Sequence, residues 1–309
     1  MKLAMVFPGQ GSQSVGMLSG YEDYPAVQRT LGEAGAALGQ DLWALAAEGP
    51  VEELNQTVNT QPLMLAADVA VYRAWREAGG PEPALVAGHS LGEYAALVAA
   101  GALTLAAALP LVRFRAQAMQ DAVPAGVGAM AAIMGLDEVA LGAACAEAAQ
   151  GQIVEPVNFN APGQIVIAGH REAVERAIVA AKAKGAKRGV LLPVSAPFHS
   201  SLLKPAAERL AAYLADVSIA SPTVPVLHNV DAKTAADGAG VRNALAKQAA
   251  SPVRWVETVQ AFIAGGVTHV VECGPGTVLC GLCRRIAPEV EVLPANDGAA
   301  LAAALAAIA

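Results

Sequence analysis

Short apolar runs and longer stretches of helical periodicity alternate over most of the chain. The apolar runs have the length and character of buried strands and lie at 2–7, 84–87, 226–229 and 268–272, the last of which we take as the final strand. Helical periodicity occupies 26–78, 93–100 and 202–215, the segments around Leu245 and Phe262, and a final basic segment with Arg284 and Arg285. Within the first of these stretches, Thr57 is a candidate helix cap. Alternating strands and helices favour an α/β layer architecture.

The predicted strands and helices are shorter in the middle of the chain, between about Gly128 and Val194. Strands are predicted at 129–134, 153–159, 164–168 and 188–194, with helices at 137–149 and 172–184. The order βαββαβ is that of a ferredoxin-like unit. We therefore expect a small domain at 127–195, inserted into a larger domain formed by 1–126 and 196–309.

Composition argues against a membrane protein. Hydrophobic residues make up 55% of the 309 residues, but no run of about 18 apolar residues lacks glycine, proline or charge. The apolar start of the chain is too short for the core of a signal peptide, because Pro8 and Gly9 interrupt it. The sequence thus predicts a soluble, cytoplasmic protein.

Charge and cysteine content exclude two further classes of function. The net charge of −7 and the lack of a dense basic block argue against a nucleic-acid partner, so any acidic partner needs a local basic patch. Of four cysteines, only Cys280 and Cys283 are close in sequence, and a single CxxC is a weak metal signal. We expect packed, reduced thiols and no metal site.

A serine between a predicted strand and a predicted helix is the leading nucleophile candidate. The segment Gly88-His89-Ser90-Leu91-Gly92 follows the strand at 84–87 and precedes the Ala-rich helix. In a G-x-S-x-G turn the small flanking residues allow a sharp bend that exposes the serine hydroxyl. The free N–H groups of the following helix also favour negative charge at this position. The alternative is a plain glycine-rich turn.

A serine hydroxyl needs a base, and the chain has five histidines to supply one. His89 adjoins Ser90, but the turn directs its side chain elsewhere; His170, His228 and His269 lie in or beside regular elements, where structural roles are common. His199 lies in an irregular segment, Ser195 to Ser200, after the small domain. Spacing alone leaves His199 and the others open. No carboxylate is an obvious third member, and a backbone carbonyl could hold the imidazole instead.

Two arginines interrupt an apolar helical stretch and suit an acidic acyl substrate. The planar guanidinium of Arg113 or Arg115 could bind a carboxylate through two hydrogen bonds, and a buried arginine would disfavour substrates that lack the acid. One of the two is expected to be an ordinary solvated side chain.

Several separated motifs together resemble one family, the malonyl-CoA:acyl carrier protein transacylases of fatty-acid synthesis. The similarity runs in order from about Met5 to Arg285. The motifs are Phe7-Pro8-Gly9-Gln10-Gly11-Ser12-Gln13, Gly88-His89-Ser90-Leu91-Gly92-Glu93-Tyr94, Val157-Asn158-Phe159-Asn160-Ala161-Pro162-Gly163-Gln164, Pro197-Phe198-His199-Ser200 and Gly274-Pro275-Gly276. The set is far more specific than G-x-S-x-G alone.

The resemblance implies an α/β-hydrolase-like large domain with a ferredoxin-like small domain, and an active site in the cleft between them. It also implies roles for individual residues. These are Ser90 as nucleophile, His199 as base, Arg115 as the ligand of the malonyl carboxylate, the backbone N–H groups of Gln10 and Leu91 as the oxyanion hole, and the main-chain carbonyl of Gln248 as the group that orients the histidine. Phe198 resembles the residue associated with selectivity for malonyl over methylmalonyl groups.

The implied reaction is ping-pong transfer of malonyl from malonyl-CoA to acyl carrier protein, with no metal or redox cofactor and with the protein as a monomer. An acidic carrier would dock on part of a basic set: Lys182, Lys184, Lys187, Arg188, Lys204, Arg284 and Arg285. A serine hydrolase or thioesterase and a non-catalytic interaction module remain as alternatives. The sequence leaves open whether the pathway makes fatty acids or polyketides.

Overall fold

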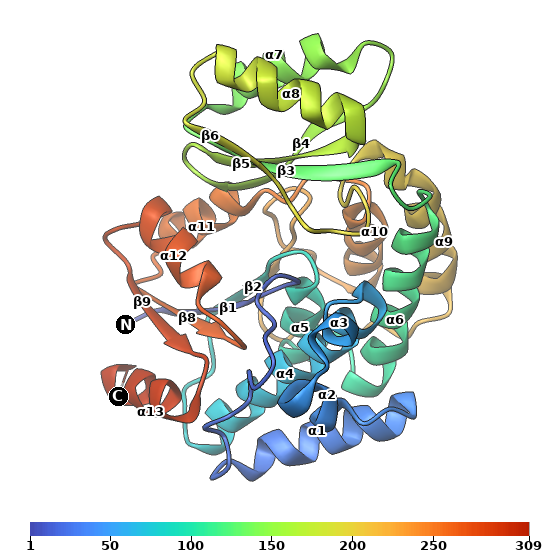
Figure 1. Ribbon diagram of the computed structural model, residues 1–309. Helices are drawn as coiled ribbons and strands as arrows, with labels where there is room; N and C mark the ends of the chain where they lie inside the picture. Colours follow the sequence, from blue (N-terminus) through green and yellow to red (C-terminus); the bar gives the residue numbers. More distant parts are fainter. Residues whose placement is uncertain (309) are drawn as a thin grey trace.

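The computed structural model describes residues 1–308 and contains two sheets (Figure 1). The larger sheet is entirely parallel, with the order β7-β2-β1-β8-β9. Its strands are β1 (Leu3–Phe7), β2 (Leu85–Gly88), β7 (Val226–Leu227), β8 (His269–Cys273) and β9 (Glu291–Ala295). All residues of β1 are buried, as expected for a central strand that is covered on both faces.

Helices cover both faces of this sheet. They are α1 (Pro25–Leu38), α2 (Leu42–Glu48), α3 (Val51–Leu54), α4 (Thr57–Glu77), α5 (Gly92–Ala99), α6 (Leu105–Asp121), the 3₁₀ turn η1 (Ser201–Leu203), α9 (Lys204–Ala215), α10 (Gly238–Gln248), α11 (Trp255–Ala264), α12 (Val278–Ile286) and α13 (Gly298–Ile308). The strand period of two divides β1 between two cores. Met5 and Phe7 belong to the core with α4, α5 and α6, whereas Ala4 and Val6 belong to the core with α11 and α12.

The smaller sheet is antiparallel, with the order β4-β5-β3-β6. It is built from β3 (Gly128–Met134), α7 (Glu138–Ala149), β4 (Val154–Ala161), β5 (Gln164–His170), α8 (Arg171–Ala183) and β6 (Arg188–Leu191). The helices α7 and α8 cover the outer face of the sheet, around a core of their own, and the opposite face lies toward the large sheet (Figure 1). The order and the directions are those of the predicted ferredoxin-like unit.

Four of our sequence-based expectations about elements were wrong. The strand expected at 188–194 ends at Leu191. The strand at 268–272 is not the last, because β9 and α13 follow it. Pro294 interrupts the strand pattern of β9, and it is tolerated because β9 is an edge strand. Thr57 does not cap α4 but is its first residue, and Gln56 holds the cap position without a side-chain hydrogen bond. The strand expected at 226–229 ends at Leu227, so two polar residues follow it in a loop.

The fold brings the ends of several strands to one region. Parallel strands present their carboxyl ends at the same edge of a sheet, and ligands of α/β proteins bind there. The loop after β1, the turn after β2 and the loop after β7 therefore all leave this edge. Over residues 1–308, no helix combines the length and apolarity needed to cross a bilayer.

The four cysteines are buried and unpaired, including both members of the CxxC segment. Burial raises the pKa of the Cys283 thiol to about 12, so it stays protonated. No group of three or more metal-binding side chains occurs among the described residues.

Candidate active site

Ser90 lies on a sharp turn between β2 and α5, in the left-handed backbone conformation with φ 51°. This conformation is rare for a residue other than glycine and needs support from its surroundings. The glycines on either side are required by space. A Cβ atom on Gly88 would lie 1.8 Å from the carbonyl carbon of Gly92, and one on Gly92 would lie 2.0 Å from the carbonyl oxygen of Phe7. The turn therefore packs against the end of β1 with no room for a side chain.

His199 is the one histidine of the five that reaches the serine. Its Nε2 lies 2.7 Å from Ser90 Oγ, although the two residues are 109 positions apart. Its Nδ1 lies 3.0 Å from the carbonyl oxygen of Gln248 and 3.1 Å from that of Ser251. Because carbonyl oxygens only accept, Nδ1 carries the proton and Nε2 is free to accept from the serine hydroxyl. The side chain is oriented as a base without a carboxylate.

The surroundings of His199 keep the imidazole neutral. Burial, followed by the positive charge of Arg115, lowers the pKa of His199 to about 3. The histidine is 3% exposed, so water does little to stabilise an imidazolium. At neutral pH this group is a free base.

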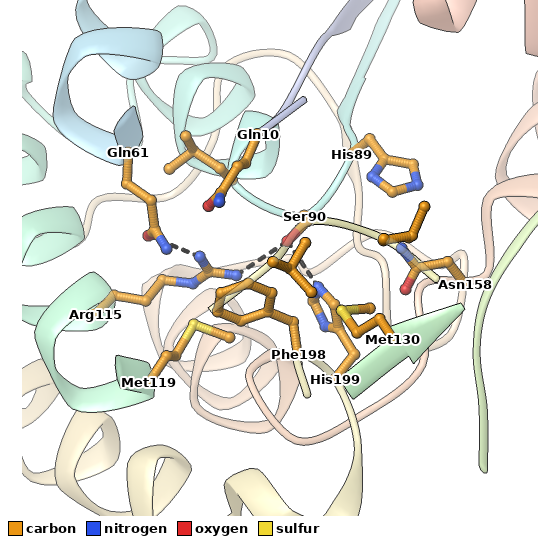
Figure 2. Close-up of a pocket in the computed structure, with 13 residues that line it drawn as sticks. Gln10, Gln61, His89, Ser90, Arg115, Met119, Met130, Asn158, Phe198 and His199 are labelled. Carbon is orange, nitrogen blue, oxygen red and sulfur yellow. Dashed lines mark hydrogen bonds between the residues drawn. The ribbon is translucent and has the colours of Figure 1, made fainter. Parts of the chain in front are cut away.

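Arg115 is a buried cation at the other side of the serine (Figure 2). Its guanidinium donates through Nη1 to Gln61 Oε1 at 2.8 Å, and through Nη2 to Gln248 Oε1 at 2.9 Å and Ser90 Oγ at 3.1 Å. The side chain is 2% exposed and lies over the Tyr94 ring, 5.5 Å from its centroid. Its Nε has no protein partner. Within residues 1–308 this guanidinium forms no ion pair with a carboxylate, which leaves it available to an acidic ligand.

Arg113 has a different environment. It donates to the Leu38 carbonyl at 3.3 Å and to the side chain of Gln40. These contacts tie α6 to the end of α1 and place Arg113 outside the cavity that contains Arg115. Of the two candidate arginines, only Arg115 faces the serine.

A small cavity of about 120 Å³ contains these groups. Pockets for drug-sized ligands measure roughly 300–1,000 Å³, so this one suits a short acyl chain. Its walls come from loops and helices next to the larger sheet and from residues of the smaller sheet (Figure 2). They are Gln10, Gln61, His89, Ser90, Leu91, Arg115, Met119, Met130, Asn158, Leu192, Val194, Phe198 and His199. The cavity thus holds a cation, a hydroxyl and its neighbouring base among amide and apolar side chains.

Two backbone N–H groups beside the serine are candidates for binding an oxyanion. Gln10 follows β1, and Leu91 precedes the first residue of α5. The two loops approach closely at Gly9, where a Cβ atom would lie 2.5 Å from the His89 carbonyl oxygen. Neither the Gln10 N–H nor the Leu91 N–H donates to another group in residues 1–308. The Ser90 N–H, in contrast, donates to Asn229 Oδ1 at 2.7 Å.

The other four histidines have partners away from the serine hydroxyl. His89 bonds Asn160 at 2.8 Å, His228 bonds Glu93 at 2.7 Å, and His269 bonds Thr268 at 2.8 Å. His170 accepts from the Ile153 N–H at 2.9 Å. Each therefore has a contact of its own, and His170, His228 and His269 lie in or beside regular elements as expected.

Sequence reasoning missed four polar contributions to this site. They come from Gln61, Glu93, Asn229 and the side chain of Gln248, which donates to the Ser90 carbonyl at 2.9 Å. All four residues are buried. The available signal was a polar residue inside an otherwise apolar stretch, such as Gln61 in α4, because buried polar groups need partners.

Comparisons with known proteins agree on one family. The model of the family described as "Acyl transferase domain" matches residues 4–295. The chain is 56% identical over 305 residues to the malonyl CoA-acyl carrier protein transacylase of Escherichia coli O157:H7, covering 98% of this chain and 99% of that protein. It is 46% identical over 298 residues to the protein of the same name from Bacillus subtilis, covering 96% and 94%.

Solved structures of malonyltransferases also match the chain over nearly its whole length. The acyl-carrier-protein S-malonyltransferase from Burkholderia pseudomallei matches with a TM-score of 0.98 and 59% identity, covering 99% of this chain and 100% of that one. A malonyl-transacylase solved in complex with its type II PKS acyl-carrier protein matches with a TM-score of 0.98 and 52% identity, covering 99% and 100%.

Proposed function

The chain belongs to the acyl transferase family, and from that premise we propose that it moves a malonyl group from malonyl-CoA to the phosphopantetheine thiol of acyl carrier protein. The observation that carries the proposal is the unpaired, buried Arg115 guanidinium 3.1 Å from a serine hydroxyl that is also bonded to a neutral histidine. A nucleophile and a fixed cation in one small cavity suit an acyl group that ends in a carboxylate.

In the first half-reaction, Ser90 is the nucleophile and His199 the base. As Ser90 Oγ forms a bond to the thioester carbon, Nε2 of His199 takes the hydroxyl proton. The negative charge moves to the carbonyl oxygen, where the N–H groups of Gln10 and Leu91 stabilise it. The carbon–sulfur bond then breaks, the imidazolium returns its proton to the sulfur, and coenzyme A leaves.

The second half-reaction reverses these steps with another thiol. His199 takes the proton of the phosphopantetheine thiol, and the sulfur attacks the malonyl ester of Ser90. When the carbon–oxygen bond breaks, the serine recovers the proton. The main-chain carbonyl of Gln248 keeps Nδ1–H in place throughout, so the same tautomer serves both steps.

Arg115 selects the acyl group. A malonyl carboxylate replaces Ser90 Oγ as the partner of the guanidinium, which frees the serine lone pair for attack. An acyl group without the acid leaves the buried cation without a charged partner. Phe198 lies in the apolar wall of the cavity and limits room for branches on the acyl chain.

Since the reaction exchanges one acyl link for another of similar energy, it needs no metal or redox cofactor.

We propose a single-chain enzyme in the cytoplasm. Its four unpaired thiols fit a reducing compartment. The separate core under α7 and α8 supports a small domain at 127–195, inserted between 1–126 and 196–309.

An acidic carrier protein would dock on part of the predicted basic set. All seven candidates are exposed: Lys182, Lys184, Lys187, Arg188, Lys204, Arg284 and Arg285. Three of them already have partners within the chain, since Lys184 pairs with Glu147, Arg284 donates to a backbone carbonyl and Arg285 bonds residues of the small domain. The four others are the better candidates, and transfer should weaken with salt if they take part.

Intact-mass spectrometry of the protein mixed with malonyl-CoA tests the proposal. The expected result is a malonyl adduct on the wild type, none on Ser90→Ala, and weak, unselective labelling of Arg115→Ala when acetyl-CoA is offered in parallel. Holo carrier protein should then remove the adduct and gain its mass. Release of free malonate at the same rate without the carrier would indicate a hydrolase instead, and the absence of any adduct on folded protein would refute the covalent mechanism.

A further inference from the structure

Asn229 joins the two sides of the turn that carries Ser90. It lies in the loop after β7 and is fully buried. Its Oδ1 accepts the Ser90 N–H at 2.7 Å, and its Nδ2 donates to the Gly88 carbonyl at 2.7 Å. The carboxamide thus bonds the backbone before and at the nucleophile.

A buried carboxylate holds Asn229 itself in place. Glu93, in the first turn of α5, is fully buried and accepts the Asn229 N–H through Oε2 at 3.0 Å. The same Oε2 accepts from Gln248 Nε2 at 2.8 Å, and Oε1 lies 2.7 Å from His228 Nδ1. Burial alone would lower the pKa of His228, but its contacts with Glu93 outweigh burial and raise it. Glu93 therefore has a partner on each oxygen and a fixed position.

Through Gln248, the hydrogen-bond network around Glu93 also reaches Ser90, Arg115 and His199. Gln248 donates to the Ser90 carbonyl at 2.9 Å, accepts from Arg115 at 2.9 Å, and offers its main-chain carbonyl to His199 at 3.0 Å. With Asn229, it fixes the backbone on both sides of the Ser90 side chain. Buried side-chain hydrogen-bond networks of this kind restrict the geometry of the groups that they connect.

We propose that Asn229 is a positioning residue for the transfer reaction, an inference that rests on the function proposed above. Asn229 accepts the hydrogen bond of the Ser90 N–H, so this N–H cannot donate to an oxyanion. The Leu91 N–H is then the donor of this turn that can face the oxyanion. It also holds Ser90 in its left-handed conformation, with Oγ aimed at His199. Without the carboxamide, the turn loses two hydrogen bonds, and the hydroxyl moves away from the line of attack.

The test is the time course of acylation at a single turnover, measured on the whole protein with malonyl-CoA. In Asn229→Ala the rate constant should fall about 10²-fold, the size of effect that a misplacement of about 1 Å produces. The malonyl-CoA concentration for half-maximal rate should change by less than about threefold, because Arg115 keeps its hydrogen bonds to Gln61 and Gln248. Asn243→Ala, at an exposed asparagine of α10, is the matched control and should react like the wild type.

The amplitude of the reaction separates positioning from a merely structural role. A slow reaction that still labels the full amount of protein supports the proposal. Reduced labelling at the wild-type rate constant would mean that part of the protein is misfolded, and an unchanged rate constant would mean that the turn keeps its shape unaided; either result overturns it. If the wild type forms no adduct, the proposed function fails rather than this inference.

Asn229→Asp gives a second variant that does not depend on the folding of Asn229→Ala. A protonated carboxylic acid keeps both an acceptor for the Ser90 N–H and a donor for the Gly88 carbonyl, whereas a carboxylate has no donor. The titratable groups that face this position are Glu93 and His228, with His199 and Arg115 beyond Ser90, and all are shared with the wild type. The ratio of variant to wild-type rate should rise as pH falls from 8 to 5.5, and a constant low ratio would contradict the donor role.

Discussion

The neutral state of His199 predicts an unusual pH profile for acylation. Burial and then the charge of Arg115 lower the pKa of this imidazole to about 3. A histidine with an ordinary pKa of about 6.5 would be roughly 9% neutral at pH 5.5, and the rate would fall about 11-fold from its alkaline value. With a pKa of about 3, more than about 99% remains neutral. The second-order rate constant for malonyl-CoA should therefore change less than about twofold between pH 8 and 5.5.

Bound substrate changes one of the two causes of the low pKa of His199, the positive charge of Arg115. A malonyl carboxylate paired with Arg115 offsets the positive charge that disfavours the imidazolium, so the pKa of His199 in the complex lies above that in the free enzyme. Rates at low malonyl-CoA report the free enzyme, and rates at saturation report the complex. The acid limb at saturation should therefore lie at higher pH than the limb at low concentration.

Rapid-quench acylation over this pH range is the assay, with the labelled fraction measured at each pH to correct for unfolded protein. Arg115→Ala should move the acid limb of the profile at low malonyl-CoA to higher pH, because it removes a charge that lowers the pKa of His199. Arg113→Ala, two positions away on α6 and outside the cavity, should leave the profile unchanged. A fall of tenfold or more by pH 5.5 in fully labelled wild type would refute the neutral-base reasoning.

Three further predictions concern selectivity and stability. Arg115→Ala should lower the rate of malonyl transfer about 30- to 1,000-fold, equivalent to about 2–4 kcal/mol for a buried charge pair, and change acetyl transfer little in a parallel labelling assay. Gly92→Ala should prevent folding or lower the melting temperature sharply, because the new Cβ would lie 2.0 Å from a β1 carbonyl oxygen, whereas Gly142→Ala, in an open position of α7, should be tolerated. His228→Ala should lower the free energy of unfolding in urea. Because the pKa of His228 is raised in the folded state, the ionic part of this loss is full at pH 5.5 and disappears as pH rises through that pKa.

The nucleophile could be predicted from sequence because its determinants are local. A strand, a five-residue turn and a helix are contiguous, and the two glycines that make room for Ser90 lie within two residues of it. The same holds for the βαββαβ order of the small domain, although the pairing of its first strand, β3, with its last, β6, joins distant parts of that segment. Short-range patterns of this kind depend on period and turn chemistry alone.

The base could not be chosen from residue patterns, since only the fold brings it to the serine. His199 lies 109 residues from Ser90 and has φ 66°, which no propensity predicts. Its orienting group is a main-chain carbonyl, which every residue possesses, so the identity of Gln248 carried no signal without the family resemblance. The assignments of Ser90, His199 and Arg115 remain predictions about roles, and the geometry supports them.

Asn229 and Glu93 were missed for a related reason. The hydrogen bond between Ser90 and Asn229 spans 139 residues, and the one between Asn229 and Glu93 spans 136. Both depend on β7 ending two residues earlier than its apolar pattern suggested. Had β7 continued to 229, alternation would have placed His228 and Asn229 on opposite faces of the sheet. The loop conformation instead lets the Asn229 N–H and the His228 side chain reach the same carboxylate.

His199 is oriented by a neutral carbonyl and not by a carboxylate, and this suits a negatively charged substrate. A carboxylate about 8 Å from a malonyl carboxylate would cost about 2 kcal/mol of repulsion at an effective dielectric constant of about 20. It would also raise the pKa of His199, whereas the Gln248 carbonyl orients the ring without adding charge. The carboxylate of this network, Glu93, instead accepts hydrogen bonds from His228, Asn229 and Gln248. Arg115 is thus left as the unpaired charge in the cavity, and an anionic acyl group is the ligand that completes it.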